Sequence, residues 1–367
     1  SFFVLCSRKS SENSLVSMYT VGDKGIAVKE RCCPRFSGNE GGNCMLSFVF
    51  LVIGFALMIW GADKFVAGAS ALARKLGVSP LLIGLTIVAF GTSMPELAVS
   101  VTAALRGANE IAVGNVVGSN IFNLLMVAGL SAAVCPLVMD KTLLRRDWPL
   151  SILAAVLLLG AIAPDLTIAR WEGVVLLIIF AFILTHQIRT ALQNREQLAA
   201  ADAEAEAEEA EAPMSAAMIW VNILLGLACI VIGGQLAVNG ADWFVDGAAG
   251  LADRFGIPQL VIGLTIVAMG TSLPELVTSI VAARKGQNDI AMGNVIGSNL
   301  FNIFLILGVS SVITPIPVQA TSIVDCLFLI AISAVFYLPA RKGKLGRVPG
   351  IAMVAMYAVY TVYLIMR

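Results

Sequence analysis

Ten apolar segments constrain the fold of this chain more than any other feature. A helix that crosses about 30 Å of hydrocarbon needs roughly 20 apolar residues. Candidates lie at about 46–72, 81–105, 111–135, 148–163, 170–190, 217–250, 260–283, 290–313, 323–340 and 347–366. Only 13% of the residues are charged, about half the share that coats a soluble domain. We therefore expect an all-α integral membrane protein with ten transmembrane helices.

Composition also excludes several classes of function. The formal net charge is +0, so the chain lacks the basic surplus of a nucleic-acid-binding protein. A single histidine, His186, excludes most histidine-rich metal sites and histidine-based catalysis. The seven cysteines have no paired spacing, so they indicate neither a disulfide framework nor a zinc motif. An intramembrane hydrolase would need a nucleophile–base pair or a metal triad, and the sequence offers neither. We expect no cofactor and no enzymatic activity.

An internal repeat divides the chain. The motif Gly61-Ala62-Asp63 recurs 179 residues later as Gly240-Ala241-Asp242. At this offset residues 61–131 align with 240–310 without a gap, and about 41 of the 71 positions are identical. The two halves, 45–190 and 217–367, are therefore copies of one unit. Each copy holds five apolar segments, and an odd number predicts that the second copy is inverted in the membrane.

Two segments lie outside the repeats. Residues 1–44 are polar and unpatterned, and Met45 opens the first apolar run, so we expect 1–44 to be an upstream leader with no role in transport. Residues 191–216 contain an acidic alanine- and glutamate-rich tract, which is typical of a solvated linker. This tract lacks the glycine turn and the spaced oxygen ligands of a calcium-binding loop, although a regulatory role stays open.

The distribution of basic residues predicts the orientation. With the N-terminus outside, the cytoplasmic loops hold about 13 lysines and arginines and the outer loops about four. This asymmetry favours both termini outside the cell membrane and the acidic linker inside. Surface features follow the same scheme: we expect Asp63 to pair with Lys64 or a loop arginine, His186 to be interfacial, and the tryptophans to mark span ends.

A glutamate lies near the middle of one apolar span in each repeat. Glu96 ends the motif Gly91-Thr92-Ser93-Met94-Pro95-Glu96, and Glu275 ends Gly270-Thr271-Ser272-Leu273-Pro274-Glu275. An ionisable residue inside a membrane is costly and suggests a functional site. The proline removes one backbone hydrogen bond of the helix, and non-helical backbone at this depth is tolerated where it lines a cavity. The sequence thus predicts, twice, a carboxylate beside exposed carbonyl and hydroxyl oxygens.

The next span adds amides and hydroxyls in both copies. It reads Gly114-Asn115-x-x-Gly118-Ser119-Asn120-x-x-Asn123, and its copy reads Gly293-Asn294-x-x-Gly297-Ser298-Asn299-x-x-Asn302. These side chains could simply bond neighbouring helices. Beside two buried glutamates, however, they complete an oxygen-only ligand set suited to calcium or sodium. Two carboxylates neutralise one divalent or two monovalent ions, which favours an exchanger over the alternative class, a cation channel.

The paired Gly-Thr-Ser-x-Pro-Glu and Gly-Ser-Asn-x-x-Asn motifs resemble the two α-repeats of the calcium/cation antiporter superfamily, specifically its bacterial sodium/calcium exchanger branch. The resemblance covers residues 45–367. Vacuolar-type proton/calcium exchangers tend to carry Gly-Asn-x-x-Glu at the first motif, so Thr92-Ser93 and Thr271-Ser272 point away from them. The resemblance implies an exchanger-like fold of inverted five-helix repeats that exports calcium from the cell against inward sodium by alternating access.

The resemblance also implies a ligand set. Carried over position by position, the implied ion ligands are Glu96, Glu275, Thr92, Ser93, Thr271, Ser272, Ser119, Asn123, Ser298, Asn302 and the carbonyls of Ala89 and Ala268. Asn302 stands where some exchangers have aspartate, which weakens the case for a potassium site. Hydroxyl ligands favour sodium as the coupling ion, but buried carboxylates also carry protons, so a proton-coupled calcium antiporter is the alternative. We expect a monomer in the bilayer whose only ligands are the transported ions.

Overall fold

The computed structural model describes residues 40–105, 109–193, 214–255 and 269–366. Residues from Cys44 to the C-terminus form one compact unit, to which the account below is confined. Its α-helices are α1 (Glu40–Leu76), α2 (Pro80–Ile83), α3 (Ala89–Thr92), α4 (Met94–Leu105), α5 (Asn109–Phe122), α6 (Gly129–Val134), α7 (Trp148–Ile162), α8 (Arg170–Gln193), α10 (Ala216–Phe255), α12 (Leu273–Arg284), α13 (Asn288–Leu300), α14 (Leu307–Ile313), α15 (Thr321–Ala340) and α16 (Arg347–Met366). Four π-helical segments are η1 (Gly84–Val88), η2 (Asn123–Ala128), η3 (Leu143–Asp147) and η4 (Phe301–Ile306).

The described helices bear out a multi-pass membrane protein. Seven of them are long and apolar enough to cross a membrane, and a bent pair, Pro80–Thr92 with Met94–Thr102, supplies an eighth candidate. The count of ten stays a prediction. Helix α7 has only 15 residues, and the start of the span predicted at 260–283 lies outside the described residues.

The helix is interrupted shortly before each glutamate, as the prolines predict. Between α3 and α4 the helix axis bends by 44° at Ser93. Ser272, the residue before α12, has nearly the same backbone angles (φ −90°, ψ 5°) as Ser93 (φ −83°, ψ 6°). A proline that follows such a break sits in the first turn of a new helix, where its missing N–H costs nothing. Each glutamate therefore occupies a helix N-terminus, whose dipole favours negative charge.

Glycines bring the second repeat directly onto the first. Helix α13 packs against α2, η1 and α3, and its Gly293 and Gly297 lie against the backbone of η1. A Cβ atom at Gly297 would lie 2.7 Å from both the Leu85 carbonyl oxygen and the Ala89 Cβ. In the second copy these two glycines, four residues apart, therefore allow close helix packing.

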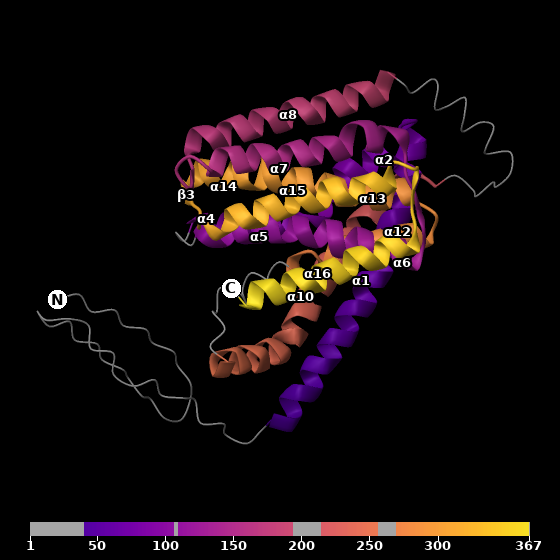
Figure 1. Ribbon diagram of the computed structural model, residues 1–367. Helices are drawn as coiled ribbons and strands as arrows, with labels where there is room; N and C mark the ends of the chain where they lie inside the picture. The colour runs from indigo at the N-terminus through magenta and orange to yellow at the C-terminus, as the bar shows by residue number, and fades with distance from the viewer. Residues whose placement is uncertain (1–39, 106–108, 194–213, 256–268, 367) are drawn as a thin grey trace, which may run out of the picture. The chain divides into compact units, whose positions relative to one another are not determined.

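The outer helices pair across the repeats. Helix α8 lies along α14, α7 along α15, and α16 along α6 (Figure 1). Trp148, which we expected at an interface, is fully buried between α7 and α15, and its Nε1 donates to the Ser333 carbonyl oxygen at 3.2 Å. Trp148 begins α7, at a span end as expected, although this end of the helix is covered by α15.

Two small antiparallel sheets join loops at the helix ends. Strand β1 (Leu137–Val138) pairs with β4 (Lys344–Leu345), and β2 (Thr167–Ile168) pairs with β3 (Ile316–Pro317). Each sheet therefore contains one strand from each repeat. Strands β1 and β2 flank α7 at its two ends, as β3 and β4 flank α15.

The partner of Asp63 differs from the prediction. Its Oδ1 lies 2.7 Å from Nζ of Lys285, which also donates to the Asp63 carbonyl oxygen at 3.0 Å. Lys64 instead lies over the Trp60 ring, 5.9 Å from its centroid. The ion pair ties α1 to the residue after α12, a contact between chain positions too distant for a local pattern to reveal.

Candidate cation site

The two glutamates are fully buried and are bonded by serines of the opposite repeat. Oε1 of Glu96 accepts a hydrogen bond of 2.9 Å from Ser272 Oγ. Oε1 of Glu275 accepts one of 2.9 Å from Ser93 Oγ. Four of the predicted residues are thus brought together, and neither repeat could build this arrangement alone.

Hydroxyl groups of the following helices also belong to the site. Ser298 Oγ on α13 lies 3.4 Å from Glu275 Oε1 and donates to it. Its counterpart in the first repeat, Ser119 on α5, is fully buried, and its Oγ has no partner among the residues that the structure describes. The two predicted serines therefore have different surroundings, which makes Ser119 the hydroxyl that is available to a ligand.

Several buried oxygen atoms in this region have no partner in residues 40–105, 109–193, 214–255 and 269–366. Ten buried side-chain polar atoms lack one in the described part of the chain, and half of them belong to predicted ligands: Glu96 Oε2, Glu275 Oε2, Ser119 Oγ, Asn123 Oδ1 and Asn302 Oδ1. A buried polar atom without a partner costs about 1–3 kcal/mol. This concentration of unsatisfied oxygens indicates a cation site, because carboxylate, amide and hydroxyl oxygens are the ligands of hard cations.

Four asparagine side chains form hydrogen bonds between the repeats, and these bonds orient their amide groups. Nδ2 of Asn120 donates to the Asn299 carbonyl oxygen at 3.2 Å, and Nδ2 of Asn299 donates to the Asn120 carbonyl oxygen at 3.4 Å. Asn120 Oδ1 accepts a hydrogen bond from Asn302 Nδ2 at 2.9 Å, and Asn299 Oδ1 accepts one from Asn123 Nδ2 at 3.3 Å. Since the nitrogens of Asn123 and Asn302 are committed to these bonds, their oxygens are the atoms that remain for an ion.

We did not predict Asn120 and Asn299 as site residues. The sequence carried a signal for them, because both recur beside the predicted serines in the two copies. Their partners could not be inferred, since each bonds to a helix about 180 residues away along the chain.

The predicted threonines form a layer next to the carboxylates. Thr92 Oγ1 donates to Asn294 Oδ1 at 3.0 Å, and Thr271 Oγ1 donates to Asn115 Oδ1 at 3.4 Å. Within their own repeats, Asn294 donates to Ser279 and Asn115 donates to Ser100. Because these threonine hydroxyls are engaged by the opposite repeat, their direct ligation of an ion stays a prediction.

The two predicted carbonyl ligands differ in what the structure describes. The Ala89 carbonyl oxygen accepts from Ser93 N at 3.0 Å, which closes the last turn before the break. Thr92 Oγ1 also lies within hydrogen-bond distance of this oxygen, at 3.4 Å, so its direct ligation of an ion stays a prediction. Ala268 lies outside the described residues.

A buried oxygen-only site shared by two copies of one unit is the design of a secondary transporter of cations. The family model for the sodium/calcium exchanger protein matches residues 46–189 and again residues 223–366. The chain therefore belongs to the sodium/calcium exchanger family. It is a calcium/cation antiporter and not an enzyme.

Two relatives and a solved structure agree with this membership. A protein of Alkalimonas amylolytica provisionally named antiporter CaxA is 40% identical over 83% of this chain and 93% of its own length. The sodium/calcium exchanger MaX1 of Methanosarcina acetivorans is 37% identical over 76% of this chain and 86% of its own. A structure of the sodium-calcium exchanger NCX_Mj soaked with Na⁺ and Sr²⁺ matches with a TM-score of 0.70 and 33% identity, covering 86% of this chain and 97% of the other.

Proposed function

We propose that this chain exports calcium in exchange for sodium by alternating access, and that the ions bind between Glu96 and Glu275. The observation that carries the proposal is the set of five unpartnered buried oxygens, two of them carboxylate oxygens. Two carboxylates balance one calcium ion or two sodium ions. Such a site can hold either calcium or sodium, but leaving both buried carboxylates without a cation costs free energy. The movement of calcium is therefore coupled to the movement of sodium.

Alternating access in this proposal requires that the two repeats be inverted relative to each other. Strands β1 and β3 occupy equivalent places in the repeat, 179 residues apart. In a parallel arrangement equivalent strands would lie at the same end of the molecule. Instead β1 pairs with β4 and β2 with β3, which joins non-equivalent ends of α7 and α15. This crossed pairing supports inversion.

The same pairing supports the proposed orientation in a cell membrane. The loops that carry β1 and β4 are both expected inside from their basic residues, and the loops that carry β2 and β3 are both expected outside. Pairing thus occurs between loops assigned to the same side. We keep both termini outside and the acidic linker, between the end of α8 and the start of α10, inside.

Sodium is favoured as the coupling ion by the chemistry of the site. Sodium uses neutral oxygen ligands, which a proton does not need, and the site offers Ser119 and the oxygens of Asn123 and Asn302. Asparagine at positions 123 and 302 also leaves no third carboxylate beside the glutamates to act as a dedicated proton carrier. The relative MaX1 is named a sodium/calcium exchanger.

Calcium uptake into proteoliposomes tests this function. We expect uptake under an outward sodium gradient at constant pH, and none without a counter-gradient, because an exchanger does not let calcium pass alone. Uptake driven only by a pH gradient would overturn sodium coupling and leave a proton-coupled antiporter. Calcium entry that needs no counter-ion would indicate a channel and contradict the exchange mechanism itself.

A further inference from the structure

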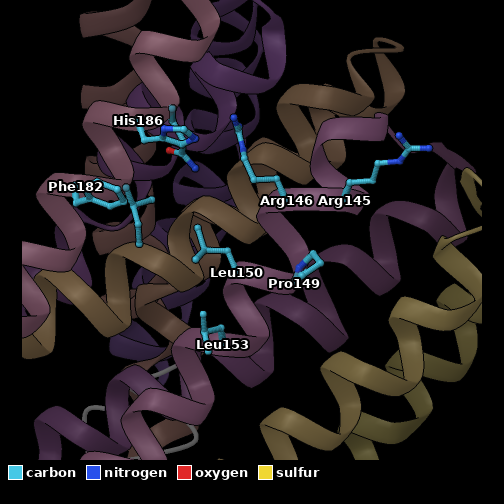
Figure 2. A pocket seen from close by; sticks show the side chains of 9 residues that line it. Arg145, Arg146, Pro149, Leu150, Leu153, Phe182 and His186 are labelled. Carbon is cyan, nitrogen blue, oxygen red and sulfur yellow. The ribbon is translucent and has the colours of Figure 1, made fainter.

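A cavity between η3, α7 and α8 lies outside the cation site. Its volume is about 380 Å³, within the range of small-molecule sites. The lining residues are Arg145, Arg146, Pro149, Leu150, Leu153, Phe182, Ile183, His186 and Gln187. Figure 2 shows that Arg146 and His186 lie toward one end and Leu150 and Leu153 toward the other. The cavity is therefore amphipathic, with cationic groups at one end and aliphatic and aromatic groups along the rest.

One of the two arginines is held in place by a buried carboxylate. Asp147 is fully buried, and its two oxygens accept from Arg146 Nε at 2.8 Å and from an Arg146 terminal nitrogen at 3.1 Å. Gln187 of α8 donates to the same carboxylate at 3.1 Å. A guanidinium carries five N–H donors, so Arg146 keeps donors for an anion while it bonds Asp147. Arg145 is exposed and leaves the same turn in another direction (Figure 2), so the cavity lining carries two arginines and no carboxylate.

The second repeat shows that the fold does not need these arginines. Asp325 follows β3 as Asp147 follows β1, and the extra residue of π-helix η3 accounts for an offset of 178 instead of 179. Asp325 accepts a hydrogen bond of 3.0 Å from Tyr360 of α16, as Asp147 does from Gln187 of α8. The aspartate thus ties two helices in both copies. The residues before it are Arg145 and Arg146 in the first copy but Ile323 and Val324 in the second.

We propose that this cavity binds one anionic phospholipid, with the phosphate at the end lined by Arg145, Arg146 and His186 and the glycerol and upper acyl chain along Leu150, Leu153 and Phe182. The occupant is a membrane lipid because the apolar wall is continuous with exposed apolar residues of α7 and α8, which face the bilayer. Basic pockets between transmembrane helices select anionic head groups by charge. Positive residues place this end at the cytoplasmic surface. The proposal does not depend on the assignment of the transported ions.

Thermal unfolding of the purified full chain tests the proposal. The additions are phosphatidylglycerol, phosphatidylcholine and inorganic phosphate, each compared with detergent alone. We expect phosphatidylglycerol to raise Tm more than phosphatidylcholine does, because a ligand that binds only the folded state stabilises it. Inorganic phosphate should have little effect, since it lacks the chain that fills the apolar part.

Three variants localise the effect. Arg145→Gln removes an exposed charge at the cavity, and Leu153→Trp fills its apolar end, so each should lose most of the phosphatidylglycerol-specific shift. Lys342→Gln, which removes one exposed charge from another loop, is the matched control and should keep the shift. Native mass spectrometry should count one retained phosphatidylglycerol in the wild type and in Lys342→Gln only. Equal shifts for both lipids, a full shift with phosphate alone, or retention in both cavity variants would overturn the proposal.

Discussion

At the scale of single residues, the site rests on Glu96 and Glu275. Both carboxylates are fully buried, and each has one oxygen bonded by a serine of the opposite repeat and one oxygen without a partner among the described residues. This arrangement differs from a structural ion pair, which would supply a cation from the protein itself. We propose that the transported ion provides the positive charge.

Neutralising either glutamate should therefore abolish transport. Glu96→Gln and Glu275→Gln keep the shape of the side chain but remove half of the site's charge, so calcium uptake into proteoliposomes should fall to background. The matched control is Glu172→Gln, because Glu172 bonds the Ala169 N–H at 2.8 Å and glutamine can still accept this bond. The site assignment fails if either site variant exchanges calcium at a near-normal rate.

The hydrogen bonds among the four asparagines give a second prediction for single residues. Asn299→Asp removes the donor to the Asn120 carbonyl oxygen and sets a carboxylate oxygen against it, which should lower stability by about 1–3 kcal/mol. The amide of Asn123, which bonds Asn299 Oδ1, should also shift and raise the KM for calcium. Tm and transport kinetics check both effects. Asn288→Asp, at the first residue of α13, is the control because a helix N-terminus favours the new charge. Unchanged KM and Tm in Asn299→Asp would contradict this role.

At the scale of helices, the close contact of α13 with η1 holds the two glutamate-bearing breaks together. The contact depends on Gly297, whose missing side chain lets the Leu85 carbonyl oxygen and the Ala89 Cβ approach. Ala89 begins the short helix α3 that ends at Thr92, just before Ser93 donates to Glu275. A displacement of α13 is thus transmitted to the site within one helical turn.

Gly297→Ala should destabilise the protein by about 1–3 kcal/mol, because its Cβ would be forced against the backbone of η1. Calcium transport should fall with it. Gly160→Ala is the matched control: no atom lies within 4 Å of a Cβ at that position in α7, so stability should be unchanged or slightly higher. Thermal unfolding in detergent compares the two, and an equal response of both variants would refute the packing argument.

The sequence predicted the helix breaks but not the contacts between them. A charge in an apolar span and a proline one residue before it are local signals. Glu96, Glu275 and the helix breaks before them could therefore be predicted from the sequence. The bond between Asn120 and Asn299 and the ion pair of Asp63 with Lys285 depend on how distant helices cross. The burial of Trp148 likewise depends on α15, which covers that end of α7.

At the scale of the whole molecule, the account requires two repeats of opposite orientation. The crossed pairing of β1 with β4 and of β2 with β3 supports this arrangement. With inverted repeats, we expect the equivalent interrupted helices to be entered from opposite sides of the membrane. Such symmetry provides two related states, one open to each side, from a single unit.

Cysteine labelling tests the inversion. Lys141 and Ala320 are exposed and occupy equivalent positions, 179 residues apart, in the two repeats. In a background without native cysteines, Lys141→Cys and Ala320→Cys should react with a membrane-impermeant maleimide from opposite sides. Lys342→Cys should react from the same side as Lys141→Cys, because β1 pairs with β4. Labelling of Lys141→Cys and Ala320→Cys from one side would exclude inverted repeats.

Calcium binding to the purified full chain tests the central claim most directly, because it needs neither a gradient nor an orientation. Titration calorimetry of the wild type should show saturable calcium binding that sodium displaces competitively. The double variant Glu96→Gln/Glu275→Gln should bind no calcium in the same range, while Glu172→Gln should bind like the wild type. Saturable, sodium-sensitive calcium binding in the double variant would contradict the assignment of the transported ions to this glutamate pair.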